Sequence, residues 1–227
     1  MNETLIPVIA IDGPSASGKG TVAALVAQEL GFHYLDSGAI YRVTALAALR
    51  TGILLDDETT LAELAAKLDV RFDNGEIFLA GEKVGEAVRS EESGNAASRI
   101  AALPQLRQAL LAFQRSFRRA PGLVADGRDM GLVVFPDAAL KIFLTAGAEV
   151  RAERRYKQLM EKGMHANLSR ILQDIQQRDE RDSARSVAPL QKCADASLLD
   201  TDTLTIAAAV AEVLVRYRGS VRQASRI

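Results

Sequence analysis

A glycine-rich loop near the N-terminus is the first segment whose residue types and spacing could do chemistry. The stretch GPSASGKGT spans residues 13–21, directly behind the apolar run LIPVIAI and ahead of an amphipathic helical pattern. It matches G-x-x-x-x-G-K in the strand, loop and helix context that this pattern requires. Glycines let successive backbone N–H groups face one anion, while Lys19 adds a positive charge for the β- and γ-phosphates. The loop therefore predicts a site for a nucleoside triphosphate.

The residue after Lys19 departs from the usual pattern. Gly20 stands where a Ser or Thr hydroxyl normally follows the lysine, and Thr21 comes one residue later. We therefore predict no metal site on the protein itself, and expect Mg²⁺ to be held mainly by phosphates and water. A glycine-rich turn without a ligand is the alternative. The predicted ATP-binding residues are Gly13, Pro14, Ser15, Ala16, Ser17, Gly18, Lys19, Gly20 and Thr21.

Arginines outside the loop form a second candidate anion site. Of the 21 arginines, 14 lie between Arg89 and Arg185, although the whole chain has a formal charge of only −1. This pattern favours a few discrete anionic groups over a long polyanion such as DNA, and an aromatic content of 5% argues against an RNA-binding surface. Phosphoryl transfer requires two anions to be positioned and neutralised, which arginine does well through bidentate contacts. The composition thus favours small anionic substrates.

Two segments place arginines where a ligand could meet them. Arg128, in DGRDMG, follows an apolar strand, and open α/β sheets bind ligands at the carboxyl ends of their strands. In RDERDSAR, the residues Arg178, Asp182 and Arg185 recur at i, i+4 and i+7 and would share one helical face. That face predicts either a ligand site or a ladder of ion pairs.

The elements that must hold these residues alternate between short apolar runs and helical patterns. Near-continuous apolar strands separated by helices predict a parallel sheet covered by helices on both faces. We expect a doubly wound, five-stranded α/β fold of the kind found in P-loop NTPases. The expected strands are LIPVIAI (5–11), FHYLD (32–36), GLVAD (122–126), ALKIFLT (139–145) and SLLDT (197–201).

Two regions interrupt this alternation. Residues 57–100 contain three short strands and an Asn74–Gly75 turn, which predicts a small antiparallel insert. From Glu149 to Arg185 the chain is strongly charged, which predicts a helical arm. The helix after the insert starts near Pro104 and is expected to bury Leu106, Leu110, Phe113 and Phe117.

The rest of the sequence excludes several classes of protein. Cys193 is the single cysteine, which excludes an internal disulfide, and no Cys/His cluster suggests zinc. No basic segment precedes an apolar stretch at the N-terminus, and no run of about 18 apolar residues occurs. We therefore expect a cytoplasmic protein without nucleic-acid or membrane partners, and a monomer by default.

Several segments together resemble the bacterial-type cytidylate kinases, which are P-loop nucleoside monophosphate kinases. The resemblance extends from end to end of the chain. It implies one kinase domain, 1–227, that uses ATP and Mg²⁺ to convert CMP and dCMP to their diphosphates by direct in-line transfer. The segments are GKGT in the loop, LDSGAIYR (35–42), NAASR (95–99), DGRDMG (126–131), VVFPDA (133–138) and RDERDSAR (178–185). The implied parts are a core (1–36, 118–147, 187–227), a lobe binding the nucleoside monophosphate (37–117) and a lid (148–186).

The resemblance also implies roles for individual residues. Arg154 and Arg155 would reach the donor phosphates from the lid, although a solvated helix face is the alternative for both. Ser37 would position the acceptor near a helix start. The implied catalytic residues are Lys19, Arg128, Arg154, Arg155 and Arg185. The implied CMP-binding residues are Arg42, Arg128 and Arg185 for the phosphate, Arg178 and Asp182 for the ribose, and Ser37, Ser98, Arg107 and Asp129.

The cytosine base is assigned by the resemblance to Asp129, Ser98 and Arg107. A carboxylate accepts a hydrogen bond from the exocyclic amine of cytosine, whereas the carbonyl of uracil would face its lone pairs. Each residue also has a plain structural alternative. Asp129 could pair with Arg128, Ser98 could cap a helix, and Arg107 could be solvated.

The reaction needs no general base. The second phosphate pKa of a nucleoside monophosphate is about 6, so its attacking oxygen is largely deprotonated at pH 7. His33 and His165 agree with this, because neither lies in a proton-transfer motif; we expect a strand-end and a solvated histidine. Closure of the arm about Gly147 would exclude water. Two other functions stay open: a kinase for UMP, AMP or shikimate, and a P-loop regulatory module without kinase activity.

Overall fold

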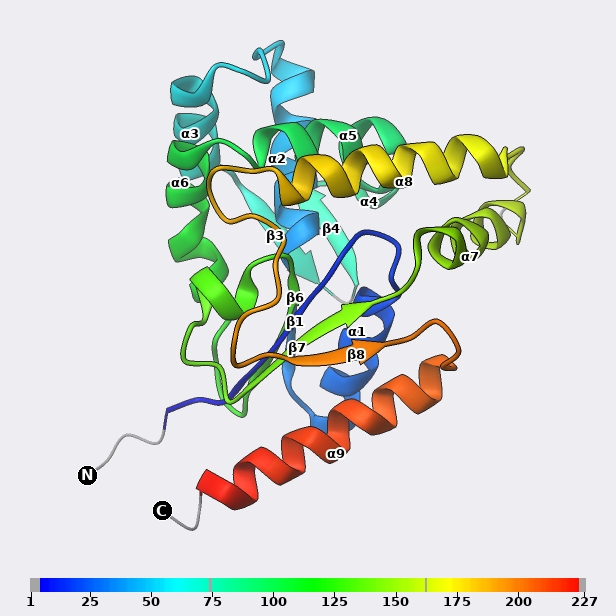
Figure 1. Cartoon of the computed structure of the whole chain (residues 1–227). Helices are drawn as coiled ribbons and strands as arrows, with labels where there is room; N and C mark the ends of the chain where they lie inside the picture. Colours follow the sequence, from blue (N-terminus) through cyan, green and yellow to red (C-terminus); the bar gives the residue numbers. More distant parts are fainter. Residues whose placement is uncertain (1–4, 74, 162, 225–227) are drawn as a thin grey trace. The chain divides into compact units, whose positions relative to one another are not determined.

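Figure 1 shows the computed structural model of the chain, which describes residues 5–73, 75–161 and 163–224. The chain divides into two compact units. Unit 1 comprises Met1–Leu35 and Phe117–Ile227, and unit 2 comprises Asp36–Ser116. Each unit has its own sheet and its own apolar core.

Unit 1 is built on a five-stranded sheet, which confirms the predicted parallel α/β core. The strand order is β2-β6-β1-β7-β8, so β1 lies at the centre, and all of its residues are buried. The parallel register sets Ile11 beside Asp126 and Asp12 beside Gly127. The chain therefore leaves β1 and β6 at the same edge of the sheet. The strands are β1 (Val8–Asp12), β2 (His33–Asp36), β6 (Leu123–Gly127), β7 (Leu140–Thr145) and β8 (Ser197–Asp200).

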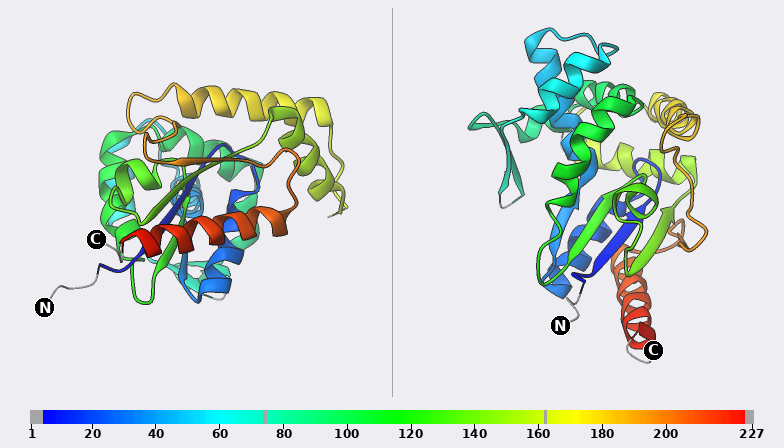
Figure 2. Two further views of the ribbon diagram at one scale, coloured as in Figure 1. Left: turned by 60° about the horizontal axis from the view of Figure 1, so that its bottom comes forward. Right: turned by 90° about the vertical axis from the view of Figure 1, so that its left-hand side faces the viewer.

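Two helices, α1 (Lys19–Leu30) and α9 (Ile206–Ala224), lie along one face of this sheet (Figures 1 and 2). Ile9 and Ile11 of β1 share one apolar cluster with residues of both helices. Because side chains alternate along a strand, Asp12 points to the opposite face. At the sheet edge, Arg216 of α9 donates a hydrogen bond to the carbonyl of Leu198 on β8 at 2.9 Å.

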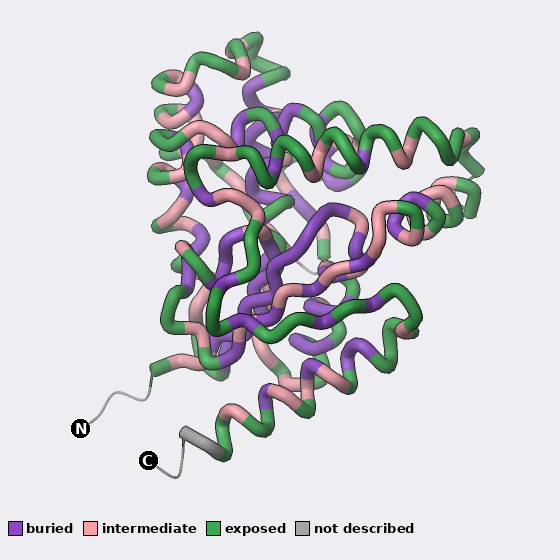
Figure 3. The backbone as a smooth tube through the Cα atoms, in the orientation of Figure 1, coloured by how far each residue is buried: buried purple, intermediate pink, exposed green. Residues whose placement is uncertain are grey.

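A pair of mutually packed helices, α7 (Ala148–Glu161) and α8 (Leu168–Ser183), forms the predicted helical arm. The Asn167 side chain begins α8 by accepting the N–H of Arg170 at 3.0 Å. The predicted helical face is wrong at its end, because α8 stops at Ser183 and Arg185 lies beyond it. The carbonyl of Asp182 there accepts the N–H of Leu190 instead of continuing the helical ladder. Figure 3 shows that α8 is largely exposed, whereas the central strands are buried.

Unit 2 contains the predicted small antiparallel sheet, in the order β3-β4-β5. Its core packs Val43 and Ala47 of α2 against Ile77 and Leu79 of β4. Asn74 of the predicted turn lies outside the described residues. The elements are α2 (Ser37–Thr51), α3 (Glu58–Ala66), β3 (Val70–Asp73), β4 (Glu76–Leu79), β5 (Glu82–Lys83), α4 (Gly85–Arg89), α5 (Glu91–Ile100) and α6 (Pro104–Arg115).

The buried face of α6 differs from the prediction. The helix starts at Pro104 as expected but ends at Arg115, before Phe117. Its buried residues are Leu106, Leu110 and Gln114, which recur every four residues, so Gln114 takes the place that an apolar side chain was expected to fill.

Candidate active site

The loop between β1 and α1, residues 13–18, is held close to its neighbouring strand. A Cβ on Gly13 would lie 2.0 Å from the carbonyl oxygen of Leu144 on β7, so only glycine fits there. Gly18 has a φ of 87°, a left-handed conformation that favours glycine, and α1 begins at the next residue, Lys19. The loop therefore leads directly into a helix N-terminus, where backbone N–H groups and the helix dipole favour an anion.

Two serine hydroxyls in this loop are suited to an anionic ligand. Ser15 and Ser17 are 8% and 1% exposed, and within the described part of the chain neither Oγ has a hydrogen-bond partner. Buried hydroxyls are normally hydrogen-bonded, and phosphate oxygens are acceptors that would satisfy both. The Lys19 Nζ donates to the carbonyl of Pro14 at 3.3 Å and lies 3.7 Å from the Asp126 carboxylate. The ammonium group is thus held at the loop.

Asp126 is the residue of this site that the sequence analysis missed. It lies near the end of β6, is 5% exposed, and accepts a hydrogen bond from the Tyr34 hydroxyl at 3.4 Å. A Cβ on Gly20 would lie 2.9 Å from the Asp126 Oδ2. Glycine after Lys19 therefore leaves room for this carboxylate. The available signal was the position of Asp126 at a strand end, two residues before Arg128.

Asp12 anchors the segment that follows β6. Its two carboxylate oxygens accept the N–H groups of Met130 and Gly131 at 2.8 and 2.9 Å. The pKa of Asp12 is raised to about 7, chiefly by burial and also by the nearby Asp129 and Asp126 carboxylates, which together outweigh the lowering effect of the two N–H donors. The segment carrying Arg128 and Asp129 is thereby tied to the end of β1, and Asp129 is itself buried.

A cluster of guanidinium groups surrounds one buried carboxylate near the end of α8. Asp182, 1% exposed, forms ion pairs with Arg128, at 3.0 Å, and with Arg185. Burial alone would raise the pKa of Asp182, but the charges of Arg128, Arg185 and Arg178 outweigh it and lower the pKa. The structure thus brings four predicted residues together, with Arg128 paired to Asp182.

Helix α7 touches the glycine-rich loop through two arginines. Arg154 donates to the carbonyl of Ser17 at 3.4 Å and to the side chain and carbonyl of Thr201. The solvated alternative is therefore wrong for Arg154. Arg151, which the sequence analysis did not assign, is buried and donates to the carbonyl of Ser15 at 3.1 Å. Arg155 is half-buried on the same helix.

The two histidines lie as expected. His33 begins β2, and its ring Nε2 lies 3.0 Å from the carbonyl of Ala120. His165 is exposed between α7 and α8.

Unit 2 gathers its own predicted site residues around α5. Arg42 donates to the carbonyls of Val88 and Ser90 at 3.1 and 3.0 Å, and its guanidinium lies against Gly94. Ser98, one turn further along α5, is buried inside the helix, so the capping alternative is wrong.

Arg107 lies beside the same part of unit 2. Its Nη1 donates to the carbonyl of Ala101 at 3.0 Å, and its guanidinium lies 5.8 Å from the centre of the Tyr41 ring. Ser37, the first residue of α2, is buried. The predicted base-reading and phosphate-binding residues of unit 2 therefore come from α2, α5 and α6.

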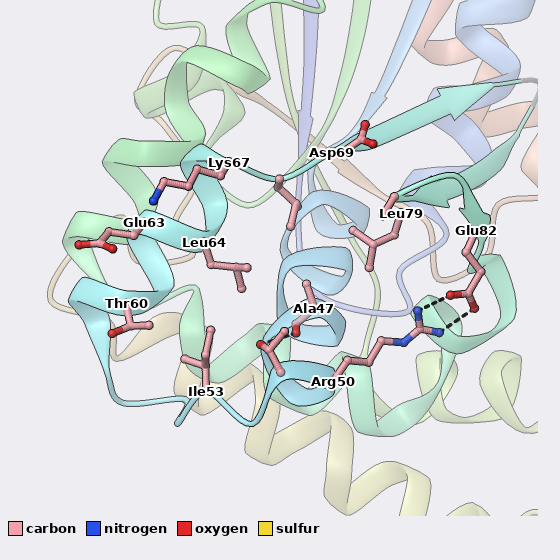
Figure 4. A pocket seen from close by; sticks show the side chains of 13 residues that line it. Ala47, Arg50, Ile53, Thr60, Glu63, Leu64, Lys67, Asp69, Leu79 and Glu82 are labelled. Atoms are coloured by element: carbon pink, nitrogen blue, oxygen red, sulfur yellow. Dashed lines mark hydrogen bonds and ion pairs between the residues drawn. The ribbon is translucent and has the colours of Figure 1, made fainter.

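A separate cavity of about 550 Å³ lies elsewhere in unit 2 (Figure 4). Apolar side chains such as Leu64 and Leu79 line it, and the ion pair between Arg50 and Glu82, at 2.7 Å, lies at its wall. None of the predicted site residues is among the residues that line it. The cavity is therefore distinct from the predicted substrate site.

Two negative findings apply to the described residues 5–73, 75–161 and 163–224. None of their helices is long and apolar enough to cross a membrane. Within the same ranges, no group of three or more His, Cys, Asp or Glu side chains is arranged to hold a metal ion.

The family model and the curated sequence relatives agree on one family. The family model described as cytidylate kinase matches residues 9–219. The chain is 60% identical over 212 residues to the cytidylate kinase of Bordetella bronchiseptica, covering 93% of this chain and 95% of that protein. It is 62% identical over 209 residues to the cytidylate kinase of Chromobacterium violaceum, covering 92% and 94%. It is 55% identical over 217 residues to that of Nitrosomonas europaea, covering 96% and 97%.

Proposed function

The chain belongs to the cytidylate kinase family, and we propose that it transfers the terminal phosphoryl group of ATP to CMP and dCMP, giving ADP and the nucleoside diphosphates. The observation that carries this proposal is the pairing of two anion sites in unit 1. One is the loop with Lys19 and the buried Ser15 and Ser17 hydroxyls. The other is the guanidinium cluster around Asp182. A phosphotransferase needs both, one for the donor and one for the acceptor.

The donor is bound by the loop and by the base of the lid. The backbone N–H groups of the loop surround the phosphates, Lys19 neutralises the β- and γ-phosphates, and the lid arginines Arg154 and Arg155 supply further charge. Arg154 already lies at the carbonyl of Ser17, which supports a place for its guanidinium beside the loop.

The acceptor is bound by arginines and read by a carboxylate. Arg42, Arg128 and Arg185 hold the monophosphate, and Ser37 positions it. Arg178 and Asp182 bind the ribose hydroxyls. Asp129 accepts from the cytosine amine with Ser98, and Arg107 donates to the ring acceptors, so uracil would leave a buried charge unpaired.

The carboxylate of Asp126, beside the loop, is suited to hold Mg²⁺. Asp126 is a hard oxygen donor, it is buried, and Gly20 leaves it space. We expect Asp126 to hold the ion directly or through its water, which adds a protein ligand to an ion that is otherwise held mainly by phosphates and water. The bound ion would neutralise charge on the transferring group.

The protein's own part in the chemistry is positioning and charge neutralisation. The acceptor oxygen attacks without a general base, because its phosphate is already ionised at pH 7. The lid, residues 148–186, closes about Gly147 over both substrates and keeps water from the donor. The core is 1–36, 118–147 and 187–227, and the acceptor lobe is 37–117. We propose that the enzyme works in the cytoplasm as a monomer, without nucleic-acid or membrane partners.

A coupled ADP-release assay with CMP, dCMP, UMP, AMP and shikimate as acceptors tests the proposal. Rapid turnover with CMP and dCMP is expected, and turnover limited to another acceptor would overturn it.

An Asp129→Ala variant should lower the ratio of kcat/KM for CMP over UMP about 10-fold or more, since a base contact contributes about 1–3 kcal/mol of discrimination. The exposed Asp56→Ala is the matched control. An unchanged ratio in Asp129→Ala would remove that residue from base recognition.

A further inference from the structure

We propose that Arg151 is a positioning residue that ties the donor loop to lid helix α8, so that the donor site and the acceptor-side arginine cluster are set by one side chain. The inference rests on the proposed phosphoryl transfer for its functional meaning. Its geometry lies entirely within unit 1.

Arg151 uses each nitrogen of its guanidinium for a different element. Its Nε donates to the carbonyl of Ala146, at the base of the lid, at 2.8 Å. Its Nη1 donates to the carbonyl of Ser15 in the donor loop at 3.1 Å. Its Nη2 pairs with the Asp179 carboxylate on α8 at 2.6 Å. One rigid, planar group thus joins the donor loop, the lid base and the second lid helix.

Burial makes this arrangement specific for arginine. Arg151 is 4% exposed, so its charge must be compensated, and the Asp179 carboxylate compensates it. Lysine carries the same charge at a single nitrogen and cannot keep the fixed fork that reaches all three acceptors.

The contact with Ser15 bears on the shape of the phosphate site. Holding the Ser15 carbonyl towards the lid fixes the orientation of the peptide between Ser15 and Ala16. Ala16 then adopts a φ of 57°, a left-handed conformation that a non-glycine residue rarely takes. Successive N–H groups around such a residue form a concave site for anions. Arg151 therefore stabilises a strained loop geometry from outside the ligand site.

The contact with Asp179 bears on the acceptor side. Asp179 precedes Asp182 by one helical turn on α8, and Asp182 holds Arg128 and Arg185. A shift of the donor loop is thus transmitted through Arg151 and Asp179 to the cluster that would grip the acceptor. Positioning errors of about 1 Å can cost about 100-fold in rate, which sets the size of effect to look for.

The test compares Arg151→Lys, Asp179→Asn and the double variant, with the exposed Arg170→Lys on α8 as the matched control. Steady-state kinetics are measured with ATP and CMP, the affinity for ATP by calorimetry without CMP, and folding by thermal unfolding. We expect Arg151→Lys to lower both ATP affinity and kcat/KM for ATP about 10- to 100-fold. Asp179→Asn, which leaves the Ser15 contact, should lower kcat about 10-fold while ATP affinity changes less than about twofold.

Non-additivity is the decisive readout. If the two residues act as one link, the double variant should be no more than about threefold worse than Arg151→Lys alone. Effects that multiply, or Arg151→Lys kinetics within about twofold of the wild type, would overturn the proposal. Asp179→Asn keeps the test valid if Arg151→Lys does not fold. A wild-type enzyme that fails to phosphorylate CMP would refute the proposed function instead, while the calorimetric comparison would still report on Arg151.

Discussion

The donor loop and the lid cluster bind charge by opposite means. The donor loop presents backbone N–H groups and buried hydroxyls, and its carbonyls are held by arginines that lie outside the loop. The lid cluster presents guanidinium side chains and keeps them in place with one buried carboxylate, Asp182. A main-chain site depends on conformation and on glycines, whereas a side-chain site depends on charge balance. Substitutions in the donor loop should therefore mainly lower activity, whereas substitutions in the lid cluster should mainly lower the free energy of unfolding.

The largest effect is expected at the one side-chain charge of the donor loop. Lys19→Ala should lower kcat/KM for ATP about 1,000-fold, because removing a preorganised donor to developing charge costs about 100- to 1,000-fold. The free energy of unfolding should fall by less than in the lid cluster, since the backbone cradle remains and Asp126 keeps the hydrogen bond from Tyr34. Steady-state kinetics and urea unfolding measure the two quantities, with the exposed Lys157→Ala as control. A variant with nearly normal kinetics would show that the loop amides alone suffice.

The lid cluster should instead lose stability when its carboxylate is neutralised. Asp182→Asn leaves Arg128 and Arg185 without their buried counter-charge, which costs about 3–5 kcal/mol in the free energy of unfolding. Urea unfolding of this variant and of the exposed control Asp174→Asn measures the loss. Equal stability of the two variants would show that solvent or other carboxylates already balance the arginines.

Asp12 ties the segment carrying Arg128 to the end of β1, and the pH dependence of stability tests its protonation. Its pKa is raised to about 7 in the folded state, so between about pH 4 and pH 7 the folded state keeps a proton that the unfolded state has lost. The free energy of unfolding should therefore fall as pH rises through this range, by about 1–2 kcal/mol between pH 5 and pH 7. Asp12→Asn should remove that part of the slope. Parallel slopes in the two proteins would mean that the two N–H donors keep Asp12 ionised.

The smallest effect is expected from restoring the usual hydroxyl of the donor loop. Gly20→Ser would put a Cβ 2.9 Å from the Asp126 Oδ2, so the carboxylate must move. We expect kcat/KM for ATP to fall about 10-fold, since displacement of a positioning group by less than 1 Å is tolerated only in part. Gly219→Ser, on the open side of α9, is the control. If Gly20→Ser reached half of its maximal rate at a lower Mg²⁺ concentration than the wild type, the role given to Asp126 would be contradicted.

Sequence patterns predicted the elements whose structure depends on neighbouring residues in the chain. The buried strands were predictable because near-continuous apolar runs with turn signals between them suit a parallel sheet, and the donor loop because its glycines and Lys19 have one well-known use. The strand pairing that places Asp126 beside Gly20 is a long-range contact that no spacing encodes. For the same reason, the burial of Arg151 could not be recognised from the sequence. Its partners at Ser15 and Asp179 are distant in the chain.

Helix ends were the least predictable local feature. Arg185 was placed on the face of α8 by periodicity alone, but the carbonyl of Asp182 turns to Leu190 and ends the helix earlier. In α6 the buried row follows Leu106, Leu110 and Gln114, because packing within unit 2 selected a slightly rotated face over the more apolar one. Tertiary packing overrides periodicity at such margins.

One of the two edge strands of the five-stranded sheet, β8, has a consequence for how the chain behaves in concentrated solution. Its edge leaves Leu198 54% exposed, and open strand edges recruit foreign strands into mixed sheets and fibrils. The Arg216 guanidinium occupies the Leu198 carbonyl, so an incoming strand would meet a cation in place of an open acceptor. Arg216 thus blocks one backbone acceptor that an incoming strand would need.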